Sequence, residues 1–329
     1  MARPASQHRI FELAITLLVI AIMATLRSSF FPTGDESILN TPTPIGAWIQ
    51  NLQQSIPAIS ATIWCIAIIY SGLVIGRTGV RFSIYPAYTL MAIPIFGVTA
   101  SMVMVSGDYL ISAIILILST LAMKYTIRCI MRSESFGDLS LAMICYGIMP
   151  LLYAPATLVC AAMLLLVLLV RNTWRDLVVT LVSLLFPIVS IGYWNWCAGE
   201  DFSAAASMIW DSIWTNSEFR FFSTLNPVSI FLLGTLIMMA LCAVSLIISD
   251  RFSLKVKSRA LMRFTALLLF VTIATLLLPS STATSFALIA VPTATLLPLI
   301  FVRMGVGFTE TLYRLMLIAA AGNMVMMSL

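Results

Sequence analysis

Long apolar stretches separated by short polar loops follow one another along this chain. A helix of about 20 apolar residues crosses a hydrocarbon core of about 30 Å. Lipid offers the backbone no hydrogen-bond partner, so each stretch that crosses it must be a helix. We therefore expect an all-α, polytopic transmembrane helical bundle that forms a single integral membrane domain over 1–329. Its predicted spans, about eleven in number, are 11–26, 57–76, 84–104, 109–127, 139–153, 154–170, 177–196, 227–249, 262–279, 285–302 and 308–328.

Prolines modify this pattern at two places. The short fifth span runs into the sixth through Pro150 and Pro155, which predicts a broken or re-entrant element. The tenth span carries Pro292 and Pro298. A proline inside a helix removes a backbone hydrogen bond and clashes with the preceding turn. We therefore expect the tenth span to be kinked.

Two longer loops, 27–56 and 197–226, each contain a predicted interfacial amphipathic helix. The first begins at Thr43-Pro44, with threonine as N-cap and proline at the first helical position. Its expected apolar face is Ile45, Trp48, Ile49, Leu52 and Ile56, and its expected polar face is Gln50, Asn51, Gln53 and Gln54. In the second, Phe202, Ala206, Ile209, Trp210 and Ile213 form the apolar face. These helices either anchor the bundle at the interface or frame a cleft for a lipid-linked or amphiphilic substrate.

Composition and charge set the class and the orientation. The chain is 61% hydrophobic and 9% charged, with a mean hydropathy of +1.05. Soluble domains are about 25% charged, so a water-soluble fold is excluded. Sixteen of the eighteen Lys and Arg residues fall on one side of the predicted spans, and only Arg27 and Arg220 fall on the other. By the positive-inside rule, the N-terminus is cytoplasmic and the C-terminus external in a bacterial inner membrane.

The distribution of the basic residues also bears on partners and processing. They stand singly or in short loops between spans, which does not indicate a nucleic-acid partner. The basic lead 1–9 and the apolar run that follows it show no cleavage site, so we expect the first span to stay as an anchor.

Several chemistries lack the residues that they need. His8 is the single histidine, no CxxC pair occurs among the six cysteines, and no GxxxxGK[ST] loop is present. These absences argue against a histidine-bound metal and against ATP-driven chemistry. The centres of the spans carry essentially no charge, which disfavours an energised transporter. Glu310 and Arg314, spaced i,i+4, are expected to form a structural ion pair.

The external side gathers seven of the thirteen Asp and Glu residues. Asp35 and Glu36 are adjacent, Asp108 precedes the fourth span, and Glu200 and Asp201 form a third acidic position. Carboxylates of this kind can act as a general base or bind a divalent cation. Solvation of the loops explains the same pattern without chemistry. The candidate catalytic residues are Asp35, Glu36 and Asp108.

The first 170 residues resemble the C-type glycosyltransferases of membranes. Gly34-Asp35-Glu36 matches their acidic motif after the first span, 45–56 their interfacial helix, and Asp108 their second external acid. The resemblance implies an inverting sugar transfer from a polyprenyl-linked donor bound with membrane lipid at the outer face. Asp35 or Glu36 would then be the base or a metal ligand.

A second resemblance covers about 108–196. The segments 146–153 (YGIMPLLY) and 171–176 (RNTWRD) look like an uncharacterised family of polytopic inner-membrane proteins of Bacteroidetes-type bacteria. Some members have borne carotenoid-cleaving oxygenase labels, but the lack of intramembrane histidines argues against such iron chemistry here. Two hypotheses stay open. The protein is a glycosyltransferase-like enzyme acting on lipid-linked sugar, or it is a non-enzymatic scaffold, an assembly subunit of an envelope complex, or a passive lipid- or glycan-handling protein.

Overall fold

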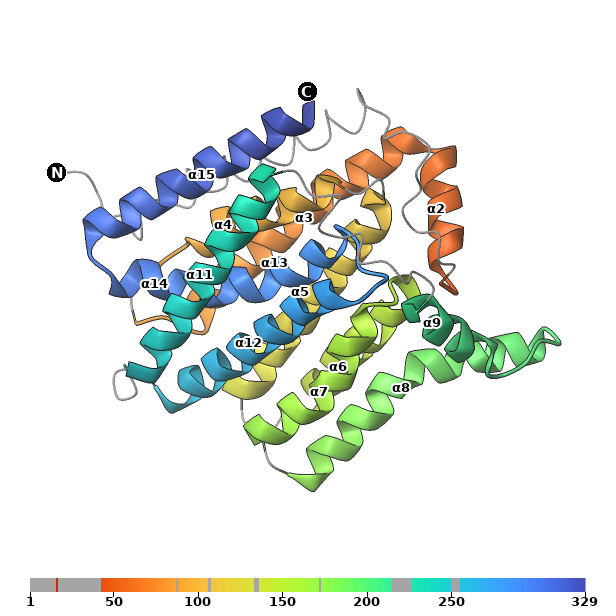
Figure 1. The fold of residues 1–329 in the computed structure, drawn as a ribbon. Helices are drawn as coiled ribbons and strands as arrows, with labels where there is room; N and C mark the ends of the chain where they lie inside the picture. Colours follow the sequence, from red (N-terminus) through yellow and green to blue (C-terminus); the bar gives the residue numbers. More distant parts are fainter. Residues whose placement is uncertain are drawn as a thin grey trace.

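A computed structural model describes Thr16 and residues 43–86, 88–105, 108–132, 136–171, 173–214, 227–249 and 255–328. These described residues form helices joined by turns, with no strand among them (Figure 1). The elements are α2 (Gly46–Ser55), α3 (Pro57–Arg81), α4 (Ala92–Ser101), η2 (Met102–Val105), α5 (Tyr109–Met131), α6 (Phe136–Leu152), α7 (Ala156–Arg171), α8 (Trp174–Cys197), α9 (Ala204–Trp214), α11 (Pro227–Ser249), α12 (Val256–Ala274), η3 (Thr275–Leu277), α13 (Ser285–Leu296), α14 (Pro298–Arg303) and α15 (Val306–Ser328).

The all-α prediction is confirmed for the described residues, and the helices are those of a membrane protein. Among the residues that the structure describes, six segments are long and apolar enough to cross a membrane: Pro57–Arg81, Tyr109–Met131, Trp174–Cys197, Ile230–Ser249, Val256–Leu277 and Ser285–Arg303. Shorter apolar helices accompany them at Ala92–Ser101, Phe136–Leu152 and Ala156–Val170. Apart from Thr16, the first predicted span lies outside the described residues. The total of about eleven spans stays a prediction.

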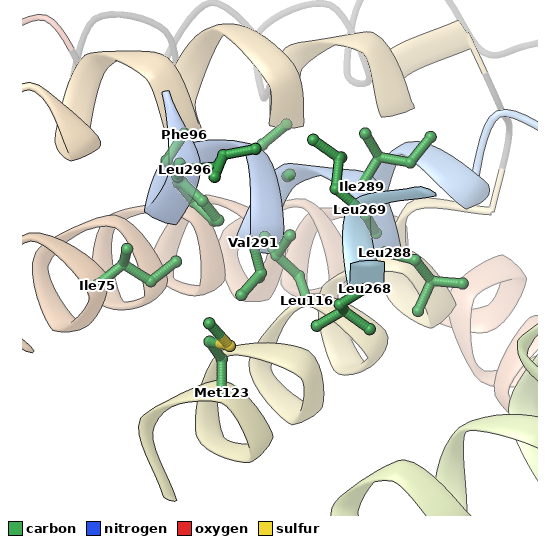
Figure 2. Packing of buried hydrophobic residues seen from close by; sticks show 14 of the residues in the cluster. Ile75, Phe96, Leu116, Met123, Leu268, Leu269, Leu288, Ile289, Val291 and Leu296 are labelled. Carbon is green, nitrogen blue, oxygen red and sulfur yellow. The ribbon is translucent and has the colours of Figure 1, made fainter. Parts of the chain in front are cut away.

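Helix α13 is central to the bundle. Every residue from Ser285 to Leu296 is buried, and α13 packs against α4, α5 and α12. A helix that is apolar on all sides is stable only when neighbours surround it. Figure 2 shows the apolar side chains that meet there, from α3 (Ile75), α4 (Phe96), α5 (Leu116, Met123), α12 (Leu268, Leu269) and α13 (Leu288, Ile289, Val291, Leu296).

One end of the bundle collects basic side chains, and we call it the basic end. There the Lys257 ammonium donates to the Met131 carbonyl over 2.8 Å, joining the start of α12 to the end of α5. Arg128 lies 3.5 Å from the Asp138 carboxylate, joining α5 to α6. The guanidinium of Arg175, in the first turn of α8, lies 4.2 Å from the centre of the Phe136 ring.

The opposite end is fixed by a different set of contacts. The Tyr109 hydroxyl donates to the Pro57 carbonyl over 3.3 Å, so α3 and α5 begin side by side. The Thr43 hydroxyl donates to the carbonyl of Leu152, the last residue of α6, over 3.2 Å. Because α5 begins at this end and finishes at the basic end, the segment between α3 and α5 must return across the bundle.

That returning segment differs from the third predicted span. A continuous helix was expected over 84–104, but α4 begins only at Ala92, and η2 completes the segment. Ten helical residues rise about 15 Å, which is half a bilayer core. Every residue of α4 is buried. Hydropathy located this apolar stretch correctly, but the prediction of one continuous helix was wrong. A stretch enclosed by protein need not be helical throughout.

The other proline-containing segments agree with expectation. The tenth span breaks at Leu297, and Pro298 starts the separate helix α14. Helices α6 and α7 are divided by the turn at 153–155, so the fifth and sixth predicted spans form a broken element.

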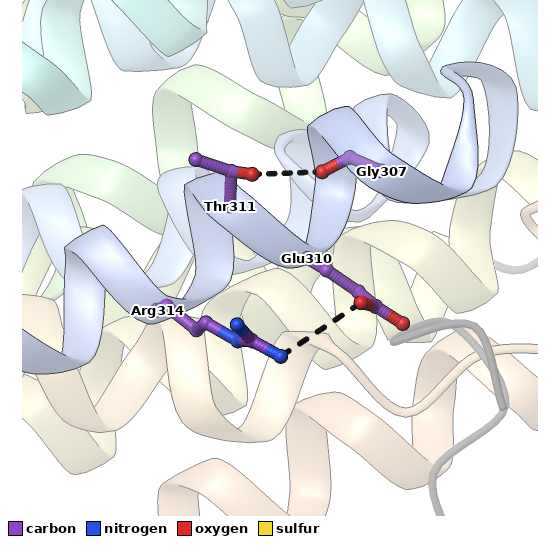
Figure 3. A network of polar contacts seen from close by, with 4 residues as sticks. All are labelled: Gly307, Glu310, Thr311 and Arg314. Atoms are coloured by element: carbon purple, nitrogen blue, oxygen red, sulfur yellow. Dashed lines mark hydrogen bonds and ion pairs between the residues drawn. The ribbon is translucent and has the colours of Figure 1, made fainter. Parts of the chain in front are cut away.

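The expected ion pair on α15 is present. Arg314 Nη2 lies 4.0 Å from Glu310 Oε2, and the Thr311 hydroxyl donates to the Gly307 carbonyl over 2.9 Å (Figure 3). The Arg314 side chain is largely exposed. Exposed pairs of this kind contribute at most about 1 kcal/mol, so its role is local.

Helices α6 and α8 approach closely at Gly147. A Cβ atom built on Gly147 would lie 2.4 Å from the Leu184 carbonyl oxygen and 3.2 Å from Leu184 Cα. Both neighbours are backbone atoms, which cannot move aside without shifting α8. By contrast, a Cβ atom on Gly137, near the start of α6, would meet nothing within 4 Å.

We therefore expect Gly147→Ala to destabilise the protein by about 1 to 3 kcal/mol, the usual range for overpacking. Gly137→Ala is the matched control, and it should be neutral or stabilising because alanine favours helix. Reversible unfolding in mixed micelles measures both variants. Equal stability of the two variants would contradict the close approach of α6 and α8.

Candidate functional site

Helix α2 is attached to the end of α6 through its first residues. The Thr43 hydroxyl accepts from the Gly46 amide over 3.1 Å. The helix itself begins at Gly46, two residues later than the predicted start at Pro44, and its N-cap residue is Ile45 and not Thr43. The same hydroxyl donates to the Leu152 carbonyl, and the Ile45 amide donates to the Leu151 carbonyl over 3.2 Å. A Cβ atom on Gly46 would lie 3.1 Å from the Leu152 oxygen. This attachment positions α2 over the start of α5.

The two faces of α2 lie in different surroundings. Ile49 points inward and is buried, but Trp48 is 65% exposed and Leu52 is also exposed. Gln50 and Gln53 instead turn toward the protein, where both bond to the start of α5. The polar face of α2 thus contacts the protein through two glutamines, and the placement of its apolar face in the membrane interface stays a prediction. Polar groups at the start of α5 need partners, whereas tryptophan is well placed at a membrane interface.

Gln53 takes over the capping of α5. Its side-chain oxygen accepts from the Leu110 amide over 2.9 Å, one of the amides that a helix start leaves without an internal partner. Asp108 occupies the N-cap position of α5, where aspartate usually accepts such an amide. Its side chain makes no capping bond. The carboxyl group of Asp108 is thus available for another role.

Asp108 is nevertheless deeply buried, at 4% exposure. Gln50 Nε2 donates to Asp108 Oδ1 over 3.0 Å, while Oδ2 has no hydrogen-bond partner in the described structure. Burial raises the pKa of the Asp108 carboxyl, and the hydrogen bond from Gln50 opposes that rise. A buried acceptor without a partner costs roughly 1 to 3 kcal/mol. The buried carboxyl group of Asp108 therefore lowers the stability of the fold.

Hydrogen-bonded hydroxyl groups link the backbone of Asp108 to two distant segments. The Ser112 hydroxyl lies 2.8 Å from the Asp108 carbonyl and 3.2 Å from the Thr284 hydroxyl. The Tyr153 hydroxyl lies 2.7 Å from the Ser285 hydroxyl. It also accepts from the Thr282 amide over 2.8 Å. We call the following residues the Asp108 cluster: Gln50, Asp108, Ser112, Tyr153, Thr282, Thr284 and Ser285.

Tyr153 lies in the turn between α6 and α7 and brings a phenol hydroxyl to the cluster. It can donate or accept a hydrogen bond, as can the serine and threonine hydroxyls. The cluster can thus bind hydroxyl groups, and Asp108 can accept or supply a proton.

The structure describes only some of the remaining predicted residues. Asp35 and Glu36 lie outside the described residues. Glu200 and Asp201 are exposed in the turn between α8 and α9, and none of the hydrogen bonds of the cluster involves them. Across the described ranges, no group of three or more His, Cys, Asp or Glu side chains could hold a metal ion. Binding of a divalent cation through Asp35 and Glu36 stays a prediction.

Part of the cluster was not identified from the sequence. The run Ser280-Ser281-Thr282-Ala283-Thr284-Ser285 lies between two apolar spans, and all of its residues are buried. This concentration of hydroxyl residues between two apolar spans is the sequence feature from which this part of the cluster could have been predicted. Tyr153 offered a weaker one, because a single tyrosine between two spans usually marks only the interface.

No protein-family model, curated protein or solved structure matches this chain. Function is therefore inferred from the Asp108 cluster alone.

The raised pKa of Asp108 predicts a pH-dependent stability. Folding favours the protonated carboxyl, so this stabilisation is complete below the ordinary value of 3.8 and is lost as pH rises through the folded-state pKa. We expect Asp108→Asn to be more stable than wild type at pH 7.5, by roughly 1 to 3 kcal/mol, with a smaller difference near pH 4.

Unfolding in mixed micelles at the two pH values checks this expectation, with the exposed Asp201→Asn as the control. Two results would contradict the burial of an ionised Asp108 carboxyl group. Asp108→Asn could be less stable than wild type at neutral pH, or the difference in unfolding free energy between the two could be the same at both pH values.

Proposed function

We propose that the protein is a glycosyltransferase-like membrane protein that acts on a lipid-linked sugar at the Asp108 cluster, with Asp108 as general base. The observation that carries the proposal is the state of Asp108. Its carboxyl group is buried, it is not used to cap α5, and one of its oxygens has no hydrogen-bond partner in the described structure. Since such a group costs stability, a role in binding or chemistry accounts for its presence.

The position of the cluster fits an amphiphilic substrate. It lies at the end opposite the basic end, beside the exposed apolar side chains of α2. By the positive-inside rule, the basic end faces the cytoplasm of a bacterial inner membrane. The cluster would then face outward, where the hydroxyls of a sugar can bond to Ser, Thr and Tyr while its lipid chain stays in the bilayer.

The proposed reaction uses the carboxylate form of Asp108. It removes the proton from the hydroxyl of the acceptor, and the freed oxygen forms a bond to the anomeric carbon of the sugar. The bond between that carbon and the phosphate oxygen breaks, and polyprenyl phosphate leaves with the electron pair. A raised pKa suits this role, because a general base works best when its pKa lies near the operating pH. Asp35 and Glu36 are candidates for a second carboxylate.

A transfer assay in membrane vesicles tests the proposal. The vesicles carry polyprenyl-phosphate-linked labelled sugar together with wild-type protein, Asp108→Asn or Asp201→Asn. We expect Asp108→Asn to lower the transfer rate by about 100-fold or more, as loss of a general base does. Asp201→Asn, which removes an exposed carboxylate at the same end, should keep the rate. Full transfer by Asp108→Asn would exclude Asp108 as the base.

The burial of Asp108 also favours a second candidate, a protein that binds such a lipid without transferring its sugar. Asp108 lies beneath α2 and is only 4% exposed, so an acceptor has little direct access to it in this conformation. This candidate predicts that polyprenyl-linked sugar co-purifies with wild type and not with Asp108→Asn, while neither shows transfer. Native mass spectrometry of the purified proteins measures the bound lipid. No such lipid on wild type would exclude both candidates.

A further inference from the structure

A cavity of about 480 Å³ opens at the basic end, far along the bundle from the Asp108 cluster. It lies between the end of α3, the non-helical segment that follows α3, and the start of α12. Its walls include Val80, Ser83, Ile84, Tyr88, Lys255 and Ser258. Cavities that bind small molecules are commonly about 300 to 1,000 Å³. The size therefore suits a ligand headgroup and not only water.

The floor of this cavity is shaped by the turn that ends α3. The Ser83 amide donates to the Val80 carbonyl over 3.1 Å, and the Ile84 amide donates to the Gly79 carbonyl over 3.2 Å. Ser83 has a φ of 47°, in the left-handed region that usually takes glycine at a helix end. The turn directs the chain away from α3 and leaves space in front of α12.

The start of α12 supplies positive potential to that space. Lys255 is the N-cap residue, and its own side chain makes no capping bond. The first amides of a helix lack internal partners and attract anions, and the helix dipole adds to the attraction. The Lys255 side chain lines the cavity and brings a full positive charge. None of the described lining residues is acidic.

Ser258 provides an independent sign of a ligand. This residue is 3% exposed, and it lines the cavity. No residue of the described chain hydrogen bonds to its hydroxyl. Buried hydroxyls normally have a partner, so the Ser258 hydroxyl offers a donor to whatever occupies the cavity. The Tyr85 hydroxyl, by contrast, already donates to the Thr295 carbonyl over 2.7 Å.

From these features we propose that the cavity is a binding site for a phosphate group, occupied by the headgroup of an anionic phospholipid. Lys255, the amides at the start of α12 and the Ser258 hydroxyl would hold the phosphate oxygens. Val80, Ile84 and Tyr88 supply an apolar wall for the adjoining glycerol and the first chain carbons. Basic pockets between membrane helices bind phospholipid headgroups in this way. The site is separate from the proposed sugar chemistry and does not depend on it.

Native mass spectrometry of the full-length protein from nanodiscs tests the site. The nanodiscs contain phosphatidylcholine alone or an equal mixture with phosphatidylglycerol. We expect wild type to retain phosphatidylglycerol selectively. Lys255→Ala and Ser258→Ala should each weaken that binding by about tenfold, as loss of a hydrogen bond to a charged group does. Lys255→Arg should preserve the binding, because it keeps the charge.

Arg263→Ala is the matched control, since it removes an exposed positive charge two turns further along α12. Phosphatidylglycerol binding that falls equally in Lys255→Ala and Arg263→Ala would overturn the site, because only general charge would then matter. Thermal stability in inorganic phosphate forms the second arm. Stabilisation of wild type by inorganic phosphate that Lys255→Ala lacks, without selective retention of phosphatidylglycerol, would keep the phosphate site and overturn its assignment to a lipid.

Discussion

Hydrocarbon supplies no hydrogen-bond partners, so every backbone group inside a membrane must find one within the protein. Several bonds of the described chain meet this constraint at places where helices begin or end. The Thr282 amide donates to the Tyr153 hydroxyl, and the Leu110 amide donates to Gln53. The Ile45 amide donates to the Leu151 carbonyl. These bonds all lie at one end of the bundle, and together they bring α2, α5, α6 and α13 to the same place. The hydroxyl-rich surroundings of Asp108 follow from that convergence.

Backbone hydrogen bonding at this end does not require the carboxyl group of Asp108. Gln53 caps α5, and Gln50 bonds to a single carboxyl oxygen. An apolar or amide side chain at position 108 would cost less free energy of folding. Proteins commonly give up stability of this kind at functional sites. The two ends of the bundle thus have different chemistry, with neutral hydroxyls and a carboxyl group at one and a positively charged cavity at the other.

Hydropathy alone located most of the described helices, because α3, α5, α8 and α12 each contain an apolar stretch long enough to cross a membrane. Proline positions located the break between α13 and α14. The form of α4 could not be predicted, because composition does not tell a lipid-facing stretch from one enclosed by protein. The contacts that orient α2 could not be predicted either, since the partners of Gln50 and Gln53 lie more than fifty residues away. The sequence identified Asp108 as a candidate, but its convergence with Tyr153 and Ser285 depends on tertiary contacts.

Photocrosslinking with a polyprenyl-phosphate-linked sugar that carries the reactive group on its sugar ring tests the central claim most directly. After irradiation in membranes, peptide mapping locates the labelled residues. The account predicts labels on the segments that surround Asp108, at 43–55, 108–112, 151–156 and 280–285. Labels confined to the basic end, or spread evenly over the lipid-facing helices, would contradict a sugar-binding site at Asp108.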